Sequence, residues 1–183
     1  MPRRIVCLAL LIVISVGVAS SQWRENGKVV PNKPWSKSEN GFGATLVFTD
    51  KPDELFAAWE KPAPGVHLSE TSTAVRGLPI VGIIYFTGCA ANAEGNCELV
   101  ARFITKAPEG KPWGDPIEAD LWVNLPPPGK DQLQLSKGNL GVIIDPGDSL
   151  GVYKVKADIL DRVSKQRMVL ERDFTAVEAP AKK

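Results

Sequence analysis

Histidine is nearly absent from this sequence, and its scarcity narrows the chemistry that the chain can perform. The 183 residues include one histidine, His67, and three cysteines. A metal site built from several histidines is therefore excluded, and a serine or cysteine nucleophile would need His67 as its base. Ser69 lies two residues away, but no nucleophile elbow and no orienting acid accompany the pair. We interpret the pair as part of a solvated edge strand.

A surplus of positive charge is also missing. The chain has 22 Lys and Arg against 21 Asp and Glu, which gives a formal net charge of +1. Proteins that grip nucleic acid need a concentrated basic surface, so we expect no nucleic-acid partner. The sequence has no phosphate-binding loop and no cysteine–histidine cluster with zinc spacing. We therefore expect neither a cofactor nor a metal.

The N-terminal residues predict an export signal. Two arginines precede an apolar run over residues 5–18, and small residues follow the run. The pattern predicts a signal peptide over residues 1–21, with cleavage between Ala19 and Gln22. An uncleaved anchor is the alternative, but a run of about 14 residues is short for a span of about 20. We expect a periplasmic or secreted protein without a stable membrane anchor.

Cleavage would leave a mature chain that is close to neutral. It would remove two arginines and no acid, so 20 basic and 21 acidic residues would remain. No polybasic patch would be left to hold the protein on anionic lipid. A chain of this length is sufficient for one domain with its own core.

The two cysteines of the mature chain, Cys89 and Cys97, lie between strand-like segments at residues 78–86 and 99–105. We expect a hairpin whose tip is closed by a disulfide, because paired thiols in an exported protein are usually oxidised. A redox site would normally place its cysteines two residues apart at a helix start. A metal site with His67 would lack a fourth ligand.

Residues 22–42 are polar and rich in glycine and proline, which predicts a flexible leader before a sandwich domain over residues 43–178 and a tail over 179–183. Trp23 and Trp35 stand out in the leader as possible partner contacts. The alternative is local packing against the edge of the sandwich. Deleting the leader is expected to leave a folded domain that binds a partner less well, and an unfolded product would place the leader in the core.

The domain itself is mostly strand. Residues 50–62 predict a short helix, with Leu55, Phe56 and Trp59 on one face. Short strands and turns then alternate to the end of the domain. Arg172 interrupts the apolar face of the last strand, which predicts a bulge or an edge position there. We expect an all-β fold: an immunoglobulin-like antiparallel β-sandwich of about seven or eight strands, with one short helix near its N-terminus.

Two resemblances agree with this fold. The last hairpin, over residues 148–177, resembles the final two strands of bacterial immunoglobulin-like domains, with a Gly-x-Tyr opening the first strand and a Phe-x-x-Val closing the second. More of the chain is similar to a family of small exported proteins of Gram-negative bacteria. The matching segments are residues 41–44, 50–62, 86–89, 95–97 and 107–110. The resemblance implies fold and location, and implies no activity.

Function is predicted mainly from the absence of catalytic motifs. We expect a binding or structural interaction module that is not an enzyme, whose partner is an envelope protein or a glycan and whose sheet edges can accept a partner strand. One alternative is an envelope hydrolase that uses carboxylates such as Asp115, Glu118 and Asp120. Another is a carbohydrate-binding module that uses Trp113 and Trp122, although Trp122 is more consistent with a core position.

Overall fold

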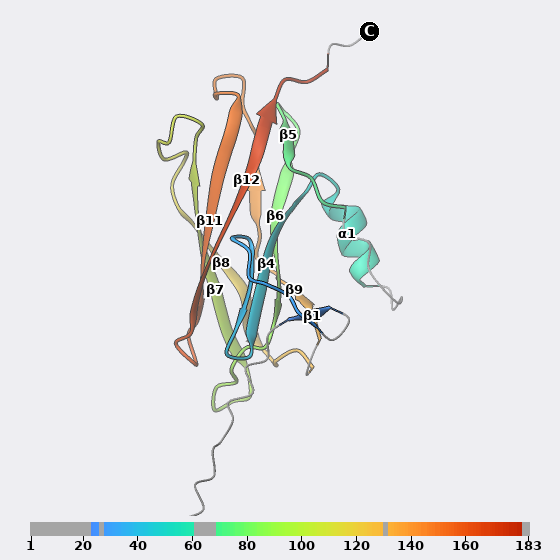
Figure 1. The fold of residues 1–183 in the computed structure, drawn as a ribbon, viewed down its shortest axis with the longest axis vertical. Helices are drawn as coiled ribbons and strands as arrows, with labels where there is room; N and C mark the ends of the chain where they lie inside the picture. The colour runs from blue at the N-terminus through green and yellow to red at the C-terminus, as the bar shows by residue number, and fades with distance from the viewer. Residues whose placement is uncertain (1–22, 26–27, 61–68, 130–131, 181–183) are drawn as a thin grey trace, which may run out of the picture.

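The computed structural model describes residues 23–25, 28–60, 69–129 and 132–180, and in this part of the chain two five-stranded sheets pack face to face (Figure 1). The first sheet contains β3 (Ser36–Glu39), β4 (Phe42–Thr49), β6 (Ile80–Thr87), β9 (Gln134–Leu135) and β10 (Leu140–Val142). The second contains β5 (Thr73–Val75), β7 (Cys97–Lys106), β8 (Ile117–Leu125), β11 (Gly151–Asp161) and β12 (Arg167–Val177). The expected all-β sandwich is confirmed.

The order of strands places β6 and β11 inside their sheets. The first sheet runs β10-β6-β4-β3, with β9 also paired to β6, and the second runs β5-β12-β11-β7-β8. All pairs in these sheets are antiparallel except β5 with β12. β1 (Arg24–Glu25) and β2 (Lys28–Val29) form a separate ribbon. The described strands outnumber the expected seven or eight because several of them have only two to four residues.

Alternation of side chains along the long strands builds the core. In β11, Tyr153, Val155, Ala157 and Ile159 are buried between the sheets, and the residues between them face outward. Phe174 of β12 joins this layer, stacking on Tyr153 with ring centroids 5.1 Å apart. Such alternation is the sequence pattern of a strand with one buried face, so these long strands could be predicted directly.

A hydroxyl–backbone contact fixes the start of β11. The Tyr153 hydroxyl donates to the Ser149 carbonyl at 2.8 Å. Burial raises the pKa of Tyr153, so the hydroxyl stays protonated and keeps donating at neutral pH. A tyrosine at the start of this strand that bonds a few residues upstream is a feature of immunoglobulin-like sandwiches.

The helix α1 (Pro52–Trp59) covers the outer face of the first sheet. Leu55 is buried against Val47 and Ile83, and Trp59 lies 5.5 Å from the Tyr85 ring. This explains why β6 is apolar on both faces. α1 has eight residues, and the described part of the chain holds no helix long and apolar enough to cross a bilayer.

The segment between the cysteines is a crossover and not the expected hairpin. β6 and β7 belong to different sheets and do not pair. The Cys89–Cys97 disulfide therefore closes a loop that passes from one sheet to the other. Strand composition alone predicted the two strands correctly, but it could not show that their partners lie elsewhere, β4 for β6 and β11 for β7.

A buried carboxylate fastens this crossover to the far end of β11. Asp161 is 2% exposed, and its side chain accepts hydrogen bonds from the backbone N–H groups of Ala90, Val163 and Ser164. One carboxylate thus joins the disulfide loop to the β11–β12 turn. Bonds to an ionised acceptor are among the stronger hydrogen bonds in proteins.

The expected leader is partly wrong, because the sandwich begins before residue 43. β3 pairs with β4 as an edge strand of the first sheet, and Ser38 is buried. Lys37 Nζ also donates to the Val169 carbonyl of β12 at 2.7 Å. Composition suggested disorder here because a short edge strand needs little apolar sequence when its backbone bonds are supplied by a neighbour.

Removal of the disulfide tests its contribution to stability. We expect Cys89→Ser/Cys97→Ser to fold with a free energy of unfolding lowered by about 2.6 kcal/mol, because the denatured chain regains the entropy of a loop of about nine residues. Urea unfolding measures this change, and the reduced wild-type protein is the control. If the free energy of unfolding falls by less than about 0.5 kcal/mol in both the variant and the reduced wild type, the disulfide does not stabilise the fold, and Asp161 and the strands are sufficient to hold the crossover.

Truncation distinguishes the N-terminal ribbon from β3. Deletion through residue 31 removes β1 and β2, whereas deletion through residue 41 also removes β3 and the Lys37 bond. We expect the longer deletion to cost about 3 kcal/mol more, at about 1 kcal/mol for each net hydrogen bond lost. Thermal unfolding measures the difference. Equal stability of the two products would show that β3 does not stabilise the sandwich.

Candidate functional site

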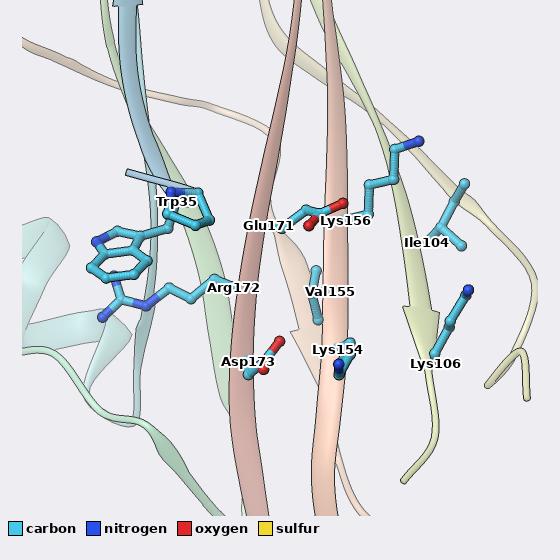
Figure 2. Close-up of a pocket in the computed structure, with 10 residues that line it drawn as sticks. Trp35, Ile104, Lys106, Lys154, Val155, Lys156, Glu171, Arg172 and Asp173 are labelled. Carbon is cyan, nitrogen blue, oxygen red and sulfur yellow. The ribbon is translucent and has the colours of Figure 1, made fainter. Parts of the chain in front are cut away.

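A groove of about 680 Å³ lies on the second sheet, and its lining residues come from three neighbouring strands and one turn of the other sheet. They are Pro34, Trp35, Ile104, Lys106, Lys154, Val155, Lys156, Glu171, Arg172 and Asp173. Figure 2 shows Trp35 beside Arg172 at one end and Lys106 with Ile104 at the other. The groove therefore crosses β12, β11 and β7.

Strand register sets the charge pattern of the groove. Lys154 of β11 lies opposite Asp173 of β12 on one side and opposite Lys106 of β7 on the other. One row along, Lys156 lies opposite Glu171. The acidic residues thus follow β12, and the basic residues follow β11 and β7.

The lysines of the groove are not neutralised by close contacts. Across the described residues, the ion pairs of this sheet involve Arg102, Asp158, Arg167 and Arg172, and none involves Lys106, Lys154 or Lys156. Lys106 and Lys154 are directly opposite each other, an arrangement of like charges that destabilises a strand pair. A bound anion would relieve this repulsion.

Arg172 connects the two sheets beside the groove. Its side chain is 16% exposed. Nη1 donates to the Leu46 carbonyl of β4 at 2.8 Å, and Nη2 donates to Glu70 Oε2 at 2.7 Å. Of the two positions predicted for Arg172, the bulge is wrong, because the β11–β12 register continues unchanged past this residue, and the edge position is confirmed. The residue instead occupies a stretch of β12 that β5 does not reach, so its side chain can cross to the first sheet.

The turn at Lys33–Ser36 holds Trp35 in place. Lys33 and Ser36 exchange two backbone hydrogen bonds, and the Pro34 carbonyl accepts from the Glu171 N–H at 2.8 Å. The Trp35 ring lies 5.8 Å from the Arg172 guanidinium and 5.6 Å from Lys33 Nζ. Trp35 is 37% exposed, so a fixed indole remains accessible at the end of the groove.

Trp23 does not join Trp35 in a common surface. Its backbone N–H donates to Ser38 Oγ, and its indole lies against Gly43 so closely that an added Cβ would overlap the ring. Trp23 is half-buried. Of the two tryptophans expected as partner contacts, Trp35 lines the groove, while Trp23 packs locally at the edge of the first sheet.

The tryptophans considered for sugar binding lie outside the groove. Trp113 Nε1 donates to Asp148, and its ring packs edge-on against Tyr153 at 5.4 Å. Trp122 packs on Phe86 at 5.8 Å, and its indole N–H donates to the Pro126 carbonyl. Both are half-buried against the core, and neither lines the groove.

The residues considered for catalysis are dispersed. Asp115, Glu118 and Asp120 are exposed and do not line the groove, and Glu118 pairs with Arg102 at 3.3 Å. His67 lies outside the described residues. The described residues contain no group of three or more His, Cys, Asp or Glu side chains that could hold a metal ion.

Most residues of the groove were missed in the sequence. Alternation over residues 151–162 predicts that Lys154 and Lys156 lie on the outward side of a strand, but Lys106, Glu171 and Asp173 carry no signal of a site. Alternation predicts which side chains of one strand share a face. Alternation does not show which strands become neighbours, so a site formed by three strands cannot be predicted from the sequence.

Comparisons with known proteins identify no family. No family model and no curated protein match the chain. A family 123 glycoside hydrolase from Clostridium perfringens has a TM-score of 0.41 and 7% identity, covering 76% of this chain and 28% of the hydrolase. A Niemann-Pick type C2 protein from the Japanese carpenter ant has a TM-score of 0.38 and 10% identity, covering 73% of this chain and 89% of the other. The chain thus spans 28% of the length of the hydrolase, and a structural similarity this weak does not indicate an activity.

Replacing Arg172 tests its role at the junction of the sheets. We expect Arg172→Ala to lower the free energy of unfolding by about 2 kcal/mol, because two charge-assisted hydrogen bonds are lost. The control is Arg102→Ala, whose side chain is 54% exposed and pairs with Glu118, and which should change stability by less than about 0.5 kcal/mol. Urea unfolding measures both. Equal effects would contradict a special role for Arg172.

Proposed function

We propose that the protein is a non-catalytic β-sandwich of the periplasm or extracellular space that binds a partner through the groove of the second sheet. The single observation that carries this proposal is the groove itself, which joins the accessible Trp35 to three lysines without close ion pairs among the described residues. Binding residues on packed strands are held in fixed positions, so little ordering is needed when a ligand binds.

Two features support the proposed location. The N-terminal residues have the pattern of an export signal, and the Cys89–Cys97 disulfide is the kind of bond that persists in oxidising compartments. The resemblance to small exported proteins of Gram-negative bacteria is part of the same proposal. Cleavage between Ala19 and Gln22 would release the domain from its signal.

The carboxylates of the groove favour binding over acid–base catalysis. Glu171 and Asp173 are exposed, and each lies opposite a lysine of β11. A carboxylic acid that donates a proton near neutral pH usually lies in an apolar, water-excluded site that raises its pKa. A solvated face that carries both signs of charge instead suits polar recognition. This supports a binding protein over the alternative of an envelope hydrolase.

Charge reversal in the groove tests the proposal. Immobilised wild-type protein should retain material from an extract of the source cells, and Lys154→Glu/Lys156→Glu should retain at least about tenfold less, since each lost hot-spot contact weakens binding by more than about 1 kcal/mol. Lys165→Glu, in the β11–β12 turn away from the groove, is the matched control and should behave as wild type.

The same experiment separates binding from catalysis. Retained material should be recovered chemically unchanged after elution, as mass spectrometry or sugar analysis would show. Equal retention by the groove variant would show that the partner binds to another surface, for example a sheet edge. Conversion of the retained material by wild-type protein would replace the proposal with an enzyme.

A further inference from the structure

We infer that the ligand of this groove is an acidic polysaccharide, lying across β12, β11 and β7 with one sugar ring on Trp35. The inference rests on the proposed function and names the class of ligand. The lining supplies three elements that such a chain requires: a flat aromatic face, cations for its acid groups, and acceptors for its hydroxyls. Each element comes from a different part of the groove.

The aromatic element is Trp35. A sugar ring presents a face of C–H groups, which packs on an accessible indole. Pro34 and Trp35 are anchored by backbone bonds to Glu171 and Leu46, and the Arg172 guanidinium lies against the ring. The indole is therefore fixed before a ligand arrives, which reduces the entropy lost on binding.

The cationic element lies on the neighbouring strands. β12 and β7 flank β11, and strands are about 4.8 Å apart, so the lysines of β11 and β7 begin about 5 Å beyond β12 and extend to about 10 Å. Lys106 and Lys154 face each other across their strand pair. A carboxylate or sulfate group placed between two opposed lysines removes their mutual repulsion and gains two attractive contacts. A neutral polymer would not obtain this gain.

The acceptors lie between the tryptophan and the lysines. Glu171 and Asp173 are exposed on β12 and line the groove. Carboxylates accept hydrogen bonds from hydroxyl groups, so they suit a ligand rich in hydroxyls.

A protein partner fits this lining less well. Protein–protein interfaces have an apolar core and usually bury at least about 1,200 Å². Among the described residues, Trp35 is the exposed large hydrophobic residue that lines the groove. The others lie outside it: Val29, Leu78, Ile117, Leu133, Ile143, Leu150 and Val152. A groove that combines an accessible indole with several charged side chains matches a hydrated, charged carbohydrate chain better.

Four polymers test the inference, with affinity measured by calorimetric titration of the purified protein at about 150 mM salt, where distant charges are screened. Polygalacturonate supplies sugar rings with carboxylates. Its fully methyl-esterified form keeps the rings without charge, polyglutamate keeps the charge without rings, and single-stranded DNA supplies phosphates. We expect polygalacturonate to bind and each of the other three to bind at least about tenfold more weakly.

Variants then locate the binding. Trp35→Ala and Lys106→Gln/Lys154→Gln should each weaken polygalacturonate binding by about tenfold, whereas Lys165→Gln should have no effect. Lys106 and Lys154 are exposed, so their substitution should leave the fold intact. The lysine variant therefore still tests the inference if Trp35→Ala is unstable. Equal binding of polyglutamate, of the ester or of DNA would overturn the inference, as would unchanged binding by both groove variants or no binding of polygalacturonate.

The outcome can be separated from that of the proposed function. If polygalacturonate does not bind but the lysine variants still lose material captured from cells, the groove binds a ligand of another class. If neither experiment depends on the groove residues, both proposals fail together.

Discussion

The two sheets of this protein meet beside the groove through one guanidinium. Arg172 belongs to β12 of the second sheet, yet it donates a hydrogen bond to the Leu46 carbonyl of the first sheet. Its guanidinium also lies against the Trp35 ring. Glu70 completes the contact at 2.7 Å. A partly buried arginine is stable only when its donors are satisfied, and here the partners come from β4 and from the segment that precedes β5. Arg172 thus joins the two sheets next to Trp35, whose backbone is held at one end of the groove by the Lys33–Ser36 turn.

The C-terminal end of β11 is held by a second polar contact. Asp161 accepts three backbone N–H groups and ties the disulfide crossover to the β11–β12 turn. Near the start of β11 the core is apolar, with Phe48, Tyr153 and Phe174 in contact through their rings, and the Tyr153 hydroxyl bonds the Ser149 carbonyl. The strand at the centre of the groove is therefore fixed at both ends. A rigid surface of this kind favours recognition by shape and charge.

Several elements of the fold were predictable because their signals are local. The alternation of β11, the apolar face of α1 and the doubly apolar β6 each follow from residues close together in the sequence. The errors arose where distant residues decide the structure. The hairpin expected at Cys89 is a crossover, β3 is part of the sheet, and no bulge forms at Arg172. The candidate site was missed for the same reason, except for Trp35.

The sequence by itself determined the all-β class, the pairing of Cys89 with Cys97 and the near absence of histidine as a possible catalytic base or metal ligand, because these depend on composition and on the period of short segments. Tertiary structure alone decided that Lys106, Lys154 and Asp173 form one row, and that Trp35 stands beside Arg172. The physical reason is that hydrogen bonding between strands is set by the packing of the whole sandwich. Residues more than sixty positions apart thus become neighbours on one face.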